Sequence, residues 1–155
     1  MIPEHIFRAY DIRGIYGQDL TENEASRIGK AFSTYLNGDG KEVIVGRDVR
    51  LSGKALQDAL TEGLLSGGCD IEDIGVVTTP VLYFSKSHYQ KDGGVMVTAS
   101  HNPRDWNGFK LLTRTSSICE GKGMEAVKKI ALDGQFKIST PGKLEENTRI
   151  LTDYK

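Results

Sequence analysis

The stretch Gly94-Val95-Met96-Val97-Thr98-Ala99-Ser100-His101-Asn102-Pro103 joins a short apolar run to a polar turn. The apolar residues 94–97 predict a buried strand of an α/β sheet. Asn102-Pro103 favours a turn, because the residue before a proline is pushed out of the helical region. Ser100 is therefore expected at a bend beyond the carboxyl end of the strand, where such sheets hold their chemistry and backbone N–H groups can face an anion.

Strand and helix patterns alternate on both sides of this stretch. Short apolar runs predict strands at 43–45, 71–77, 94–97 and 109–112. Before them, the segment 6–14 resembles a strand that breaks into a loop. Apolar residues at helical spacing predict four helices, between Thr21 and Asn37, between Ser52 and Gly67, and over 81–90 and 123–133. This alternation predicts an α/β fold of three layers, with a mainly parallel, mixed sheet between helices.

Local signals predict where these elements begin and turn. Thr21 and Glu24 form a capping box at a helix start. Ser52 is predicted as an N-cap, and so is Thr79, which has proline at the next position. Asn107-Gly108 is typical of a tight turn, which would fold the strand at 109–112 back beside the strand at 94–97.

Length and composition bound the kind of protein. At 155 residues the chain fits one domain, predicted at 1–140, and Pro141-Gly142 indicates that 141–155 is a linker or edge structure. The 20 basic and 21 acidic residues give a net charge of −1 without a basic block, which argues against nucleic acid as a partner.

The sequence also indicates the cellular compartment of the protein. No apolar run is long enough to span a membrane, and the N-terminus does not resemble a signal peptide. Cys69 and Cys119 have no metal-binding spacing and are expected to be reduced thiols. We therefore expect a cytoplasmic protein that does not bind membranes.

Ser100 is the first candidate for chemistry. A serine next to a histidine suggests a hydrolase, but neighbouring side chains of an extended segment point to opposite sides. His101 is therefore poorly placed to take the proton of Ser100, and the flanking Ala99 excludes a G-x-S-x-G motif. The structural alternative is a serine that only hydrogen-bonds its own turn.

Two further segments carry candidate anion-binding residues. Lys110 could balance a phosphate on Ser100 or act in proton transfer, or it could be an exposed lysine at a strand edge. Residues 7–14 contain Tyr10 and two arginines, which could bind an anion through a guanidinium fork. The alternative for 7–14 is a surface ion pair between Asp11 and an arginine, which would contribute little.

Residues 46–53 and Trp106 are interpreted as structural. In 46–53, Arg47 and Asp48 are expected to brace neighbouring loops, and Ser52 to cap the helix that follows. Trp106 is interpreted as a loop anchor rather than a platform for a substrate.

Four motifs together resemble the α-D-phosphohexomutases, most closely the phosphomannomutase/phosphoglucomutase branch. They stand in the order and spacing of that family and span about residues 6–110: Phe7-Arg8-Ala9-Tyr10-Asp11-Ile12-Arg13-Gly14, Val45-Gly46-Arg47-Asp48, Thr98-Ala99-Ser100-His101-Asn102-Pro103 and Asn107-Gly108-Phe109-Lys110. The resemblance implies an enzyme of four domains around one cleft, of which this chain is similar to the first.

The resemblance also implies site residues. Ser100 would carry a phosphoryl group that passes to a hexose phosphate, giving a bisphosphorylated sugar and interconverting the 1-phosphate and the 6-phosphate. Lys110 and His101 match positions for charge neutralisation and proton transfer, and Tyr10 and Arg13 match residues that line the same site. A magnesium ion would bridge the phosphate on Ser100 to aspartates of the second domain, and a hexose 1,6-bisphosphate would act as activator.

The sequence departs from the complete family pattern. It has no Asp-x-Asp-x-Asp run, and the sugar-recognition and phosphate-binding loops of the later domains are absent. We therefore expect domains two to four to be the partners of this chain, a hexose phosphate to be the substrate, and the 155 residues alone to be inactive. The alternatives are a phosphoglucosamine mutase domain and a non-catalytic module that binds sugar phosphates.

Overall fold

The computed structural model describes residues 2–114 and 122–147. These residues form a six-stranded sheet in the order β1-β5-β4-β2-β3-β6. In chain order the strands are β1 (Ile12–Ile15), β2 (Glu42–Arg47), β3 (Asp70–Val76), β4 (Gly93–Val97), β5 (Trp106–Thr113) and β6 (Leu144–Glu146). Strands β4, β2, β3 and β6 run parallel, whereas β5 is antiparallel to both β4 and β1. The sheet is mixed and mainly parallel, as predicted.

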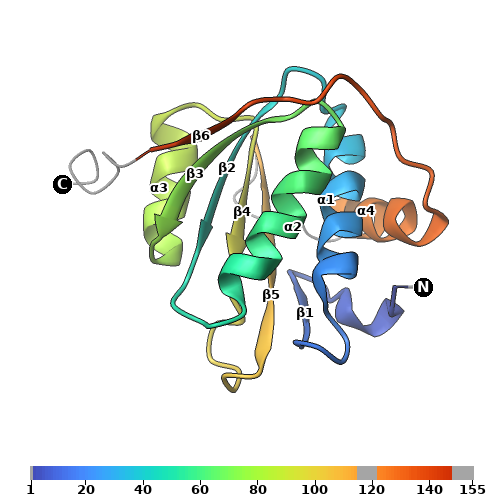
Figure 1. The fold of residues 1–155 in the computed structure, drawn as a ribbon, viewed down its shortest axis with the longest axis vertical. Helices are drawn as coiled ribbons and strands as arrows, with labels where there is room; N and C mark the ends of the chain where they lie inside the picture. Colours follow the sequence, from blue (N-terminus) through green and yellow to red (C-terminus); the bar gives the residue numbers. More distant parts are fainter. Residues whose placement is uncertain (1, 115–121, 148–155) are drawn as a thin grey trace.

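Helices cover both faces of this sheet (Figure 1). They are α1 (Glu22–Leu36), α2 (Gly53–Ser66), α3 (Thr79–His88) and α4 (Lys122–Asp133), and a short 3-10 helix spans Glu4–Ile6. Helices α1, α2 and α4 lie on one face, where Phe32 and Leu60 pack in the core cluster that contains Val45 and Phe109. Of the helices in the described residues, α3 alone lies on the other face, where Leu82 joins a separate buried cluster. The predicted three-layer α/β architecture is confirmed.

Helices α1 and α2 approach each other more closely than side chains would allow. A Cβ atom at Gly29 would overlap the carbonyl oxygen of Leu60, and one at Gly63 would overlap the carbonyl oxygen of Ser26. The backbones of the two helices are therefore in direct packing contact at these glycines. The predicted capping box fixes the start of α1, because Thr21 accepts from Asn23 N–H and the Glu24 carboxylate accepts from Thr21 N–H.

The predicted turn at Asn107-Gly108 is wrong, because both residues lie inside β5. Gly108 pairs with Arg13 of β1, and a Cβ atom at Gly108 would overlap the carbonyl oxygen of Ile12. The glycine is therefore needed for close approach of two strands and not for a turn. The strand at 109–112 does return beside β4, as predicted, through the loop that holds Ser100.

Other predicted boundaries are shifted. Ser52 precedes α2, but its hydroxyl accepts from the Asn107 side chain (2.7 Å) instead of capping the helix. Helix α3 begins at Thr79, so the N-cap position is Thr78 and not Thr79. In the segment 6–14 the order is reversed: the chain bends first, and the strand β1 follows.

The segment predicted as a linker contains the edge strand β6, which pairs with β3. The boundary at residue 140 and a continuation toward a second domain stay predictions. Cys69 is a free, buried thiol, and burial raises its pKa. Cys119 lies outside the described residues. Within the described ranges, the helices are too short or too polar to cross a bilayer.

We predict that Gly63→Ala destabilises the fold, because the added methyl group must push α1 away from α2. The free energy of unfolding should fall by roughly 1–3 kcal/mol, as for other overpacked contacts. Urea denaturation measures this. Gly53→Ala is the matched control in the same helix: its Cβ would meet its nearest neighbour at 3.4 Å, so stability should be unchanged or slightly higher. Equal stability of the two variants would contradict the close-packed helix pair.

Candidate functional site

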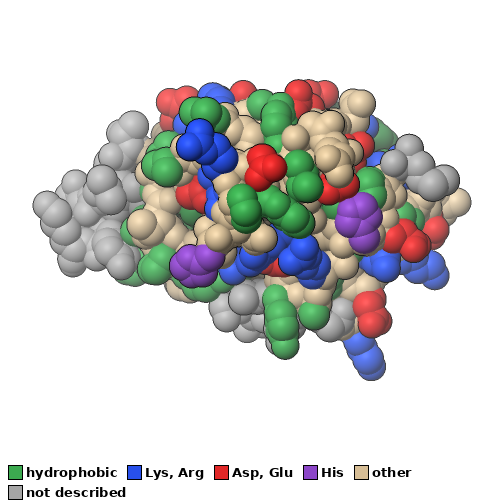
Figure 2. All heavy atoms as spheres, turned by 90° about the horizontal axis from the view of Figure 1, so that it is seen from below, with side chains coloured by type: hydrophobic (Ala, Val, Ile, Leu, Met, Phe, Trp, Pro, Cys, Tyr) green, Lys and Arg blue, Asp and Glu red, His purple; other side chains and the backbone are tan. Residues whose placement is uncertain are grey.

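The carboxyl ends of β2, β3 and β4 lie at one edge of the sheet, at the bottom of Figure 1. Figure 2 looks onto this edge and shows lysine and arginine side chains gathered near its middle, beside hydrophobic side chains. A cavity of about 490 Å³ opens here, between the segment after β2 and the loop at residues 98–105, named the serine loop. Its lining is Asp48, Val49, Arg50, Leu51, Ser100, Asn102 and Arg104.

Ser100 lies at the bend of the serine loop. It is exposed, and its φ of 52° is in the left-handed region, which costs a non-glycine residue roughly 1–3 kcal/mol. The loop holds it there: Ser100 N–H donates to Thr98 Oγ1 (3.0 Å), and the Thr98 hydroxyl donates to Asp48 Oδ2 (2.6 Å). Asp48, at the end of β2, therefore fixes the backbone of the serine through one intermediate side chain.

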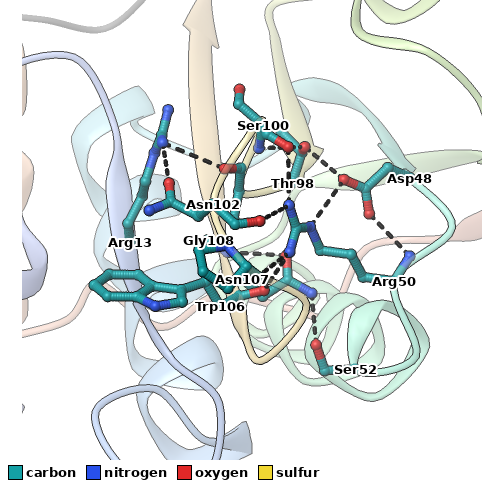
Figure 3. Close-up of polar contacts among 12 residues, drawn as sticks. Arg13, Asp48, Arg50, Ser52, Thr98, Ser100, Asn102, Trp106, Asn107 and Gly108 are labelled. Atoms are coloured by element: carbon teal, nitrogen blue, oxygen red, sulfur yellow. Dashed lines mark hydrogen bonds and ion pairs between the residues drawn. The ribbon is translucent and has the colours of Figure 1, made fainter.

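The guanidinium of Arg50 holds the serine loop from the side of β2 (Figure 3). Its side chain is only 12% exposed. The nitrogens donate to four backbone carbonyls, those of Pro103 (2.6 Å), Trp106 (3.1 Å), Ser100 (2.8 Å) and Asn102 (2.8 Å). The remaining nitrogen, Nε, lies 3.4 Å from Asp48 Oδ2, so the positive charge is balanced. One side chain therefore binds three carbonyls of the serine loop and the first carbonyl of β5.

Arg13 holds the same loop from the side of β1. Its Nε donates to Asp11 Oδ2 (2.6 Å), and its NH1 donates to the Ala99 carbonyl (3.3 Å) and to the side-chain oxygen of Asn102. The predicted ion pair with Asp11 is present, but Asp11 is only 6% exposed, so the pair is not a surface contact. The NH2 group of Arg13 has no hydrogen bond within the described residues, which leaves two donors for an anion.

Arg47, Asp48 and Trp106 match their structural interpretation in part. Asp48 braces the serine loop, whereas Arg47 donates to Gln57 of α2 (2.9 Å) and so contacts a helix instead of a loop. Trp106 begins β5 with its ring half-buried, and the guanidinium of Arg8 lies 5.4 Å from the ring centre. This position fits the predicted anchor at the end of the serine loop.

The other predicted site residues are less constrained. Lys110 is half-buried in the middle of β5, opposite Met96 of β4, and reaches this place by strand pairing instead of by a turn. His101 is exposed next to Ser100, and Tyr10 is 63% exposed in the bend before β1. In the described part of the chain none of these three side chains makes a hydrogen bond or ion pair, so of the predicted partners from outside the serine loop only Arg13 forms hydrogen bonds to it.

The described residues do not form a magnesium site. No cluster of three or more His, Cys, Asp or Glu side chains that could hold a metal ion occurs among residues 2–114 and 122–147. Asp48 is the carboxylate that lines the cavity, and its oxygens already accept from Thr98 and from Arg50 N–H (3.1 Å). Any metal at Ser100 would therefore need ligands from outside these residues.

Arg50 and Thr98 are the residues that the sequence interpretation missed. Thr98 lies in a family motif and Arg50 in the segment 46–53, but the sequence predicted no contact for either. The available signal was an arginine three residues after the end of a strand, since the guanidinium fork suits converging oxygen atoms. The carbonyls that Arg50 binds could not be predicted from the sequence, because that requires knowing that β2 lies beside β4.

The fold and the serine loop are those of a phosphohexomutase domain, and comparison with known proteins agrees. Residues 4–137 match the family described as phosphoglucomutase/phosphomannomutase, alpha/beta/alpha domain I. The crystal structure of a phosphoglucomutase/phosphomannomutase family protein from Burkholderia thailandensis is similar with a TM-score of 0.90 and 39% identity, over 99% of this chain and 35% of that one. The chain belongs to the phosphoglucomutase/phosphomannomutase family and corresponds to its domain I.

Two curated relatives differ in length. The phosphoglucomutase/phosphomannomutase of Thermococcus kodakarensis is 47% identical over 110 residues, which are 69% of this chain and 24% of the relative. The phosphomannomutase of Klebsiella pneumoniae is 42% identical over 138 residues, 88% of this chain and 87% of the relative. The chain thus spans about a quarter of the Thermococcus protein and most of the Klebsiella protein.

We predict that Thr98→Val destabilises the serine loop, because valine keeps the shape of threonine but loses both hydrogen bonds of the hydroxyl. The N–H of Ser100 then lacks its partner, and Asp48 Oδ2 keeps, among the described residues, only its ion pair with Arg50, at a cost of about 1–3 kcal/mol. Thermal unfolding of the variant measures the loss. Thr98→Ser, which keeps the hydroxyl, is the control and should lose less than half as much; if serine and valine cost the same, the hydroxyl does not brace the loop.

Proposed function

We propose that this chain is the phosphoserine-bearing domain of a phosphohexomutase that interconverts hexose 1-phosphate and hexose 6-phosphate, with mannose and glucose as the sugars. Membership of the phosphoglucomutase/phosphomannomutase family supports the reaction class. The observation that carries the assignment of the residue is the geometry of Ser100. An exposed serine is held in a left-handed conformation at the carboxyl edge of the sheet by two arginines and Thr98.

The proposed chemistry transfers one phosphoryl group from Ser100 to the sugar and then another from the sugar to Ser100. A hydroxyl of the hexose phosphate attacks the phosphorus on Ser100, the new sugar O–P bond forms, and the Ser100 Oγ–P bond breaks. The sugar hydroxyl gives up its proton and Ser100 Oγ receives one, so the products are a free serine and a hexose 1,6-bisphosphate. In the second half, Ser100 Oγ attacks the other phosphate of that sugar, which restores the phosphoserine and releases the isomeric monophosphate.

A phosphoserine needs positive charge around it, since it carries roughly −1.5 to −2 charges at neutral pH. The unused NH2 group of Arg13 supplies two N–H donors. We assign Lys110 to charge neutralisation, and His101 together with Lys110 to proton transfer, and we assign Tyr10 to the lining of the sugar site. Phosphoryl transfer depends mostly on position and charge stabilisation, so loosely held side chains are suited to tighten around the substrate.

The complete enzyme, in this proposal, is this chain together with the domains that follow domain I in the longer relatives. Those domains would supply sugar recognition and the carboxylate ligands of magnesium, which the described residues lack. Hexose 1,6-bisphosphate would act as the activator that loads Ser100. The cytoplasm stays the proposed location on the sequence pattern alone.

We expect Ser100→Ala in the complete enzyme to lower kcat by several orders of magnitude, because no other atom can take the place of Oγ. A coupled assay with mannose 1-phosphate and glucose 1-phosphate measures the effect. Ser87→Ala, at an exposed serine of α3, is the control and should retain full activity. Normal turnover by Ser100→Ala would refute the proposed role, and a preference for glucosamine phosphates would favour the phosphoglucosamine mutase alternative.

We also expect the 155-residue chain to show no mutase turnover by itself, because it lacks a metal site and later-domain loops among its described residues. The same coupled assay, with the chain at high concentration, measures this. Robust turnover would contradict the proposed dependence on further domains. A complete enzyme that binds hexose phosphates but never phosphorylates Ser100 would instead identify a non-catalytic binding module.

A further inference from the structure

The carbonyls bound by Arg50 have an unusual common direction. Backbone carbonyls of a surface loop normally bond to water or to a neighbouring strand. Here the carbonyls of Ser100, Asn102 and Pro103 in the serine loop, and that of Trp106 directly after it, all turn toward one largely buried guanidinium. Figure 3 shows the Ser100 carbonyl directed at Arg50, while the Ser100 side chain points away from it.

The planarity of the peptide bond fixes where the N–H groups point. In a trans peptide the C=O of one residue and the N–H of the next are directed to opposite sides. Because the carbonyls of Ser100 and Pro103 face Arg50, the N–H groups of His101 and Arg104 face away from it. Within residues 2–114 and 122–147, neither N–H makes a hydrogen bond. The His101 N–H is therefore a free donor on the same side of the loop as the Ser100 hydroxyl.

We propose that Arg50 is a positioning residue for phosphoryl transfer: by holding the carbonyls of the serine loop, that of Ser100 above all, it turns the N–H group of His101 toward the phosphoryl group carried by Ser100. The inference rests on the proposed function of Ser100. Arg50 does not touch the phosphoryl group, and its own charge is balanced by Asp48. Fixed N–H donors aimed at a group whose charge changes are among the strongest contributions to catalysis.

The chemistry of arginine explains why this side chain is used. A guanidinium has five N–H donors in a rigid plane, which can serve four carbonyls and a carboxylate together. A lysine has three donors on one nitrogen and cannot reach oxygens spread from Ser100 to Trp106. Arg50→Lys should therefore keep the charge but release part of the loop.

The test uses Arg50→Lys and Arg50→Ala in the complete enzyme. We expect kcat to fall by about 100-fold in the alanine variant, as for a misplaced reacting group, while KM for the sugar phosphate stays nearly constant. Phosphorus NMR of the phosphoserine supplies a second readout. Loss of N–H donors to the dianion should raise its second pKa relative to the wild type, with the lysine variant in between. Guanidinium ions added to Arg50→Ala should restore part of kcat.

Arg47→Ala is the matched control, because Arg47 stands at the same end of β2 but its guanidinium, among the described residues, forms a hydrogen bond only to Gln57 of α2. It should lower the melting temperature without changing the NMR titration of the phosphoserine, and guanidinium should not affect it. An unchanged titration in both Arg50 variants, whether or not they are less stable, would overturn the positioning role. If the wild-type enzyme itself carries no phosphate on Ser100, the proposed function fails instead. Should the alanine variant not fold, the lysine variant decides the question.

Discussion

Convergence of backbone carbonyls on the guanidinium of Arg50 is the interaction on which the site depends. The serine loop follows the carboxyl end of β4, so among the described residues the carbonyls of Ser100 and Asn102 have no partner on a neighbouring strand, and Ser100 adopts a left-handed conformation that is unfavourable for serine. Arg50, Asp48 and Thr98 provide fixed partners in one connected network. Arg13 of β1 donates a further hydrogen bond to the loop, at the Ala99 carbonyl. These contacts fix the backbone of the serine loop and leave the Ser100 hydroxyl exposed.

The mixed sheet explains how two arginines from distant parts of the chain reach one loop. Because β2 lies directly beside β4, the segment after β2 and the serine loop leave the sheet at the same edge. Because β5 returns antiparallel to β4 and pairs with β1, Arg13 comes to the opposite side of the loop. The close approach of Gly108 to the backbone of Ile12 makes this second contact possible. Strand order, more than any single motif, assembles the site.

Local signals in the sequence predicted local structure well. The capping box of Thr21 and Glu24 is confirmed because both partners lie within one helical turn, and the apolar run before Ser100 is confirmed as a buried strand. Asn107-Gly108 failed as a turn because a tertiary contact with β1 overrides the local preference of that pair. The role of Arg50 could not be predicted, since its four acceptors lie about 50 residues away and meet it only through strand order. The family motifs placed Ser100 and Arg13 in one site, but not the hydrogen bonds that hold them.

The most direct test is to find the residue that carries the phosphoryl group. The complete enzyme, incubated with hexose 1,6-bisphosphate and digested, can be analysed by tandem mass spectrometry of its peptides. The proposed function predicts one phosphoryl group, on Ser100, in the peptide that contains the serine loop, and its loss when excess hexose monophosphate is added. A phosphoryl group on another residue, or an active enzyme without any phosphorylated serine, would contradict the account.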